Sequence, residues 1–69
     1  EPEYADAYIL KARVFMKKGN LEEASKNLKI AAEKVQSSAE LFLALSEFHF
    51  QKGDLSLSKG YAEKFNALQ

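Results

Sequence analysis

Apolar residues recur every three or four positions along most of the chain, which is the spacing of one face of an α-helix. The stretch that begins at Ala5 has this spacing, and so does the stretch from Leu21 to Val35. Polar residues fill the positions between them, so each stretch has one face to bury and one to expose. The pattern predicts helices over about 4–18, 21–36, 38–52 and 55–67.

The predicted helix ends carry residues suited to turns and caps. Gly19 and Gly53 can adopt a left-handed backbone conformation without a steric penalty, and each is followed by a residue, Asn20 or Asp54, whose side-chain oxygen can cap the next helix. We therefore expect a tight turn at each glycine. The spacing of Asn20 from Glu23, and likewise of Ser37 from Glu40, further predicts capping boxes at two helix starts.

The sequence also repeats itself at a fixed offset, the distance from Gly19 to Gly53. The segment Lys18-Gly19-Asn20-Leu21 recurs as Lys52-Gly53-Asp54-Leu55, and at the same offset the aromatic Tyr8 aligns with Phe42. We call two residues related by this offset counterparts. Such a period is typical of helical repeat proteins. We expect one all-α domain over 1–69, built of two tandem antiparallel helix-turn-helix hairpins over about 5–38 and 39–69.

A helical hairpin repeated at this offset resembles the tetratricopeptide repeat, whose period is about 34 residues. In the first unit the residues that match in order and spacing are Tyr8, Ala12, Phe15, Gly19, Ala24, Leu28 and Ala31. The second unit is a degenerate copy, in which His49 stands in place of an aromatic ring and Ser58 in place of an alanine. The resemblance implies an α–α superhelix, with His49 packed as a substitute for the ring.

In tetratricopeptide repeats the first helix of each unit lines a concave groove that holds a peptide of a partner protein. The resemblance therefore implies a protein-interaction scaffold whose ligand is an amphipathic helix or an extended peptide. The residues that it places in the groove are an apolar floor of Ile9, Met16, Leu43 and Phe50 and the charged residues Arg13, Lys17 and Glu47, which would set the register of the ligand.

Composition and charge disfavour other kinds of partner. Ten basic and ten acidic residues give no net charge and no basic stripe, so neither nucleic acid nor a membrane surface is an expected partner. Without cysteine, and with His49 as the one histidine, the chain offers no usual ligand set for a metal. We expect no cofactor and no enzymatic activity. The compartment stays open, because a chain without cysteine suits both the cytoplasm and the periplasm.

Other functions remain open. The chain could be a purely structural or self-associating segment of a longer array of repeats, which Pro2, at the repeat offset before Gln36, also suggests, or an accessory part of an enzyme. The last predicted helix has two apolar sides. We expect Leu55, Ala62 and Phe65 to close its own hairpin, and an outer side to dock on a following helix, a second copy or a swapped segment through Leu57, Tyr61 and Leu68.

Overall fold

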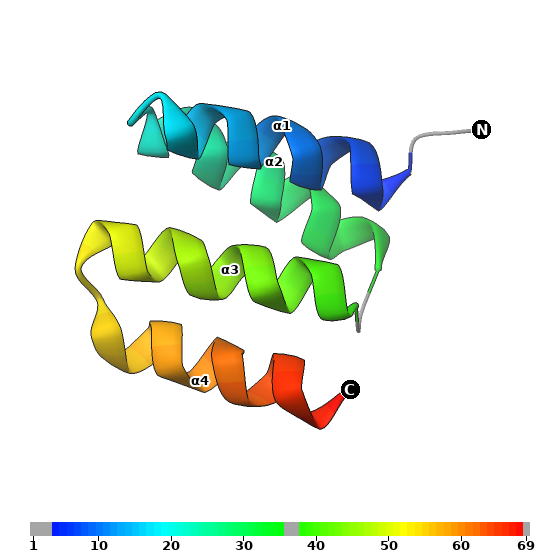
Figure 1. Ribbon diagram of the computed structural model, residues 1–69. Coiled ribbons are helices and arrows are strands. Elements are labelled where there is room, and N and C mark those ends of the chain that lie inside the picture. Colours follow the sequence, from blue (N-terminus) through cyan, green and yellow to red (C-terminus); the bar gives the residue numbers. More distant parts are fainter. Residues whose placement is uncertain (1–3, 36–37, 69) are drawn as a thin grey trace.

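The computed structural model describes residues 4–35 and 38–68, so Pro2, Gln36 and Ser37 lie outside the described residues. Within these ranges the chain forms the helices α1 (Ala5–Lys17), α2 (Leu21–Lys34), α3 (Ala39–Lys52) and α4 (Leu55–Ala67), and no strand. Helix α1 packs against α2 and α3 against α4, as two hairpins (Figure 1). The predicted all-α fold of two hairpins is confirmed.

The turns within the hairpins lie at the predicted glycines. Gly19 has a φ of 80° and Gly53 a φ of 92°, both in the left-handed region that side chains with a Cβ disfavour. The oxygen of Asn20 then accepts a hydrogen bond of 3.2 Å from the backbone N–H of Glu23, and Asp54 caps α4 in the same way. Each hairpin thus combines a helix stop and a helix start within two residues.

The predicted capping box at the start of α2 forms only in part. The side chain of Glu23 pairs with Lys26 at 3.3 Å, while the backbone N–H of Asn20 donates to a carbonyl at the end of α1 at 2.8 Å. At α3 the hydroxyl of Ser38 accepts from the backbone N–H of Leu41, and the predicted box from Ser37 lies outside the described residues. Only the half of the α2 box in which Asn20 accepts is present.

The molecule measures 34 × 28 × 15 Å, with α1 and α2 on one side of α3 and α4 on the other (Figure 1). Helix α3 packs on both α1 and α2 and thereby joins the two hairpins. Helix α4 lies at the edge of the array and, among the described helices, packs on α3 alone. The core consequently lies between α1, α2 and α3.

Small residues allow the helices of the first hairpin to pack closely. Ala12, Ala24 and Ala31 have no exposed surface, and Leu28 and Phe48 are buried in the same cluster. A methyl group at such positions lets two helix backbones approach, and larger neighbours fill the space around the contact. These alanines thus allow the close contact between α1 and α2.

Replacing Ala24 with leucine is expected to lower the free energy of unfolding by about 1–3 kcal/mol, because the added atoms have no space between α1 and α2. Thermal and urea denaturation would measure the loss. Ala32→Leu is the matched control, since Ala32 lies on the exposed face of the same helix. Equal stability of the two variants would contradict the close contact at Ala24.

The second hairpin uses serines where the first has alanines. Ser46 and Ser58 are the counterparts of Ala12 and Ala24. The hydroxyl of Ser46 donates to the carbonyl of Ser58 at 2.9 Å, and the hydroxyl of Ser58 donates to the carbonyl of Ser46 at 2.8 Å. Helices α3 and α4 are thus joined by two reciprocal hydrogen bonds.

Aromatic stacking completes the contact between α3 and α4. The ring of Tyr61 stacks on His49 at 5.6 Å and on Phe42 at 6.2 Å between centroids, so His49 packs as the predicted substitute for a ring. The Nδ1 atom of His49 is buried and has no hydrogen-bond partner among the described residues. Tyr61 therefore lies toward α3, and its predicted place on the outer side of α4 is wrong.

The expected inner side of α4 needs a further correction. Leu55 was expected to close the hairpin but is exposed, as are Leu57 and Leu68 of the expected outer side. Ala62 and Phe65 are half-buried. Ser58 is the one buried residue of this helix, so the three exposed leucines present their apolar surface to solvent.

Candidate functional site

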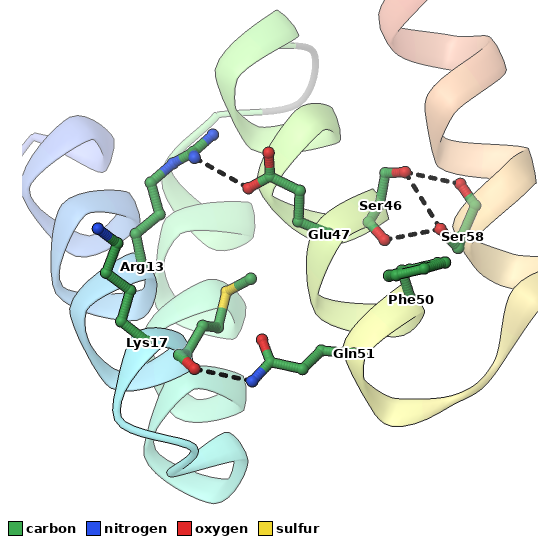
Figure 2. Close-up of a pocket in the computed structure, with 8 residues that line it drawn as sticks. Arg13, Lys17, Ser46, Glu47, Phe50, Gln51 and Ser58 are labelled. Carbon is green, nitrogen blue, oxygen red and sulfur yellow. Dashed lines mark hydrogen bonds and ion pairs between the residues drawn. The ribbon is translucent and has the colours of Figure 1, made fainter.

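A depression of about 610 Å³ lies between α1 and α3 and extends to α4 (Figure 2). We call it the α1–α3 depression. It is lined by Arg13, Met16 and Lys17 of α1, by Ser46, Glu47, Phe50 and Gln51 of α3, and by Ser58 of α4.

Equivalent positions of the two hairpins meet across this depression. Helices α1 and α3 run in the same direction, so counterparts lie opposite one another (Figure 1). Arg13 Nη1 lies 2.9 Å from Glu47 Oε1, and Figure 2 shows the two side chains pointing toward each other. Because the pair is exposed to solvent, it contributes only about 0–1 kcal/mol to stability. The pair mainly sets the positions of one positive and one negative group at the rim of the depression.

A second contact between the helices lies at the other end of the depression. Gln51 Nε2 donates a hydrogen bond of 2.8 Å to the backbone carbonyl of Met16, in the last turn of α1. This carbonyl also accepts from the backbone N–H of Gly19 at 3.0 Å, so the amide of Gln51 is its second donor. Lys17, the counterpart of Gln51, is exposed at the rim. The hydrogen bond ties the end of α1 to α3 and so defines the width of the depression there.

Phe50 gives the depression an exposed aromatic surface. Its side chain is 67% exposed and stands on the side of α3 that faces α4, near Ser46 and Ser58 (Figure 2). The hydroxyls of Ser46 and Ser58 already donate to backbone carbonyls. The ring of Phe50 is the main apolar surface beside them. An exposed ring beside charged side chains is a suitable anchor for a protein ligand, because aromatic residues commonly dominate binding energy.

The depression brings together five of the seven residues predicted for the groove, namely Arg13, Met16, Lys17, Glu47 and Phe50. Ile9 instead lines a separate depression of about 250 Å³ with Asp6, Leu10, Arg13 and Glu40. Leu43 is half-buried.

The expected exposure is wrong for two of the apolar floor residues. Ile9 is 3% and Met16 is 6% exposed, and both belong to the hydrophobic core. The reason is that α1 packs on two helices, α2 and α3, so a wider stripe of its surface is buried. Phe50 is therefore the one exposed aromatic residue that the depression offers within the described part of the chain.

Sequence reasoning did not place Ser46 and Ser58 in the site, whereas the resemblance also implied Gln51 on the groove face. The repeat offset contained a usable signal for the two serines, because they are the counterparts of two alanines. Opposite charges at equivalent positions, as at Arg13 and Glu47, would have indicated the ion pair as well. The missing step was to consider the repeats as neighbours in space.

Within residues 4–35 and 38–68 there is no group of three or more His, Cys, Asp and Glu residues that could hold a metal ion. Nor does any helix in these ranges have the length and apolar character needed to cross a bilayer. The depression itself presents one exposed ring and a rim of charged and amide groups.

This interpretation rests on the geometry of the chain itself. Comparison with protein-family models, with curated proteins and with solved structures found no match in any of the three.

Proposed function

We propose that the chain is a protein-interaction module that holds a peptide or helical segment of a partner protein in the α1–α3 depression. The observation that carries this proposal is the exposed ring of Phe50, placed in a depression whose rim presents Arg13, Lys17 and Glu47. Burial of a phenylalanine side chain by a ligand is worth about 1.5–3 kcal/mol, which makes this ring the natural anchor.

We also propose that the two hairpins are repeats of the tetratricopeptide type. The repeat offset in the sequence, the left-handed glycines at both turns and the buried alanines of the first hairpin support this proposal. The pairing of Arg13 with Glu47 across α1 and α3 agrees with it, because stacked repeats bring equivalent positions together.

The charged rim suits a ligand that is amphipathic. Arg13 and Glu47 neutralise each other in the free protein, whereas Lys17 is exposed at the end of α1. A ligand with an apolar residue for Phe50 and an acidic residue near Lys17 would match both features. Rim charges of this kind mainly affect the rate of association and the register of the ligand.

The test begins with capture of a partner by crosslinking and continues with a titration of that partner against variants. Phe50→Ala is expected to weaken the complex by about 1–3 kcal/mol with little dependence on salt, because an apolar contact is lost. Arg13→Ala is expected to act mainly on the association rate at low salt. Isothermal titration calorimetry and stopped-flow kinetics would measure the two effects.

A matched control is Leu57→Ala, which removes an exposed apolar side chain that does not line the depression. Its affinity for the partner should equal that of the unchanged protein. If Phe50→Ala and Arg13→Ala also bind normally while their circular dichroism is unchanged, the ligand does not occupy the α1–α3 depression and the proposal fails.

The alternative function is that of a structural segment that stacks on neighbouring helices. The burial of Ile9 and Met16 favours it, since two apolar residues expected to face a ligand instead join the two hairpins. A protein with this function would tolerate Phe50→Ala without loss of any partner, so the same titration separates the two functions.

A further inference from the structure

The contact between the two hairpins provides a template for a second contact. At this contact Leu21 of α2 and Phe48 of α3 line the same depression, and Phe48 is only 5% exposed. Leu41 and Ala44 of α3 are buried with it in the core. Through these residues α3 covers one side of the first hairpin.

The counterparts of the α3 residues lie uncovered on α1. Those of Leu41, Ala44 and Phe48 are Ala7, Leu10 and Val14, and all three are exposed. Leu10 is 64% and Val14 is 51% exposed. Val14 also lines an open depression of about 480 Å³ between α1 and α2. The first hairpin thus presents three apolar residues where the second hairpin has a buried face, with the exposed Lys11 in place of the half-buried Leu45.

On α4, a counterpart of the α2 residues at the template contact is exposed. Leu55 is the counterpart of Leu21 and is 61% exposed, whereas Leu21 is half-buried against the core. Ala62 is the counterpart of the buried Leu28. In the template the large residue, Leu28, lies on α2 and the small one, Ala44, on α3. At the second contact the small residue, Ala62, lies on α4 and the large one, Leu10, on α1. The exchange keeps the summed side-chain volume of this pair, which packed interfaces tolerate best.

The charges at this second contact are also compatible. In the template, Lys29 of α2 and Lys52 of α3 line the same depression. Their counterparts are Glu63 of α4 and Lys18 at the end of α1, which have opposite charges. Lys59, four residues before Glu63, is a second lysine at this contact and replaces Ser25 of the template. Glu63 would thus stand between two lysines, where the template has Lys29 and Lys52 beside one depression.

From these equivalences we propose that the face of α4 around Leu55 binds the α1 face of a second copy of this chain, in the way that α2 binds α3 within one copy. The contact joins the α4 face of one copy to the α1 face of the other. Within the pair, the first copy therefore keeps a free α1 face and the second a free α4 face. Head-to-tail contacts of this kind extend into open chains as concentration rises. The proposal does not depend on the occupant of the α1–α3 depression.

The template also distinguishes the apolar residues of α4 from one another. Leu57 and Leu68 are the counterparts of Glu23 and Lys34, which do not line the depression shared by α2 and α3. The surface predicted from the sequence, with Leu57, Tyr61 and Leu68, therefore differs from the one proposed here. Leu57→Ala should leave self-association unchanged.

Two variants with one blocked face each provide the test. Val14→Glu blocks the α1 face and Leu55→Glu blocks the α4 face, and neither residue lines the α1–α3 depression. In sedimentation velocity, the average mass of the unchanged protein should increase with its concentration. The self-association constant of each variant alone should be at least about tenfold lower, because an apolar contact is lost. An equimolar mixture of the two variants should form a one-to-one dimer and nothing larger, because one intact face of each kind remains.

Three results would overturn the proposal. One is an unchanged chain that stays monomeric up to millimolar concentration, which would leave both faces to segments outside this chain. Another is self-association of Val14→Glu at the unchanged affinity, as a symmetric α4 pair would give. The third is a mixture that stays monomeric while both variants are folded by circular dichroism.

If either glutamate variant fails to fold, a variant that only reverses a surface charge provides a second test. Glu63→Lys should weaken association several-fold at low salt, because three lysines would then meet at the contact. Glu33→Lys on the exposed face of α2 is its control and should have no effect. Equal association of these two variants would also overturn the proposal.

Discussion

Replacing Phe48 with alanine is expected to lower the free energy of unfolding by about 3–5 kcal/mol, as truncation of buried aromatic side chains usually does. Phe48 is the buried aromatic residue through which α3 packs on the first hairpin. A chain of 69 residues has a total stability on the order of 3–10 kcal/mol. The variant should therefore be largely unfolded at room temperature, as urea denaturation followed by circular dichroism would detect.

Phe50→Ala is the matched control for this prediction. It makes the same chemical change two residues away on the same helix, at a side chain that is mostly exposed. Its unfolding free energy should stay within about 0.5 kcal/mol of that of the unchanged protein. Equal losses at the two positions would mean that α3 does not face the first hairpin through Phe48.

Leu28→Ala is expected to cost about 2–5 kcal/mol, because it leaves a cavity that neighbouring helices fill only in part. Among residues 4–35 and 38–68, Leu28 is the largest side chain with almost no exposed surface, and it lies in the core cluster. Leu10→Ala is its control, since Leu10 is an exposed leucine of α1. A loss below about 1 kcal/mol at Leu28 would show that the core closes over the missing atoms.

The helices and turns of the fold could be predicted because their signals are local. The period of apolar residues located the helices to within two residues of their ends, and glycines at the turns required no knowledge of neighbours. The cap at Ser38 was not predicted, because sequence spacing alone does not distinguish two adjacent serines as capping residues.

The candidate site could be predicted only in part, because burial depends on how many neighbours a helix has. Arg13, Glu47 and Phe50 lie in the depression as predicted from the resemblance. Ile9 was expected in the groove but is buried, since α3 covers a side of α1 that a single hairpin would leave open. Leu55 shows the opposite error, because no described helix lies beyond α4 to cover it.

The position of α4 at the edge of the array has a consequence for the motions of the protein. Helix α4 buries only Ser58 fully and packs on α3 alone, so it can detach without disturbing the cluster between α1, α2 and α3. Such partial opening costs less free energy than global unfolding and exposes amide protons to exchange. In native-state hydrogen exchange, the amides of α4 should exchange well before those of α2, and a bound second copy should slow them selectively.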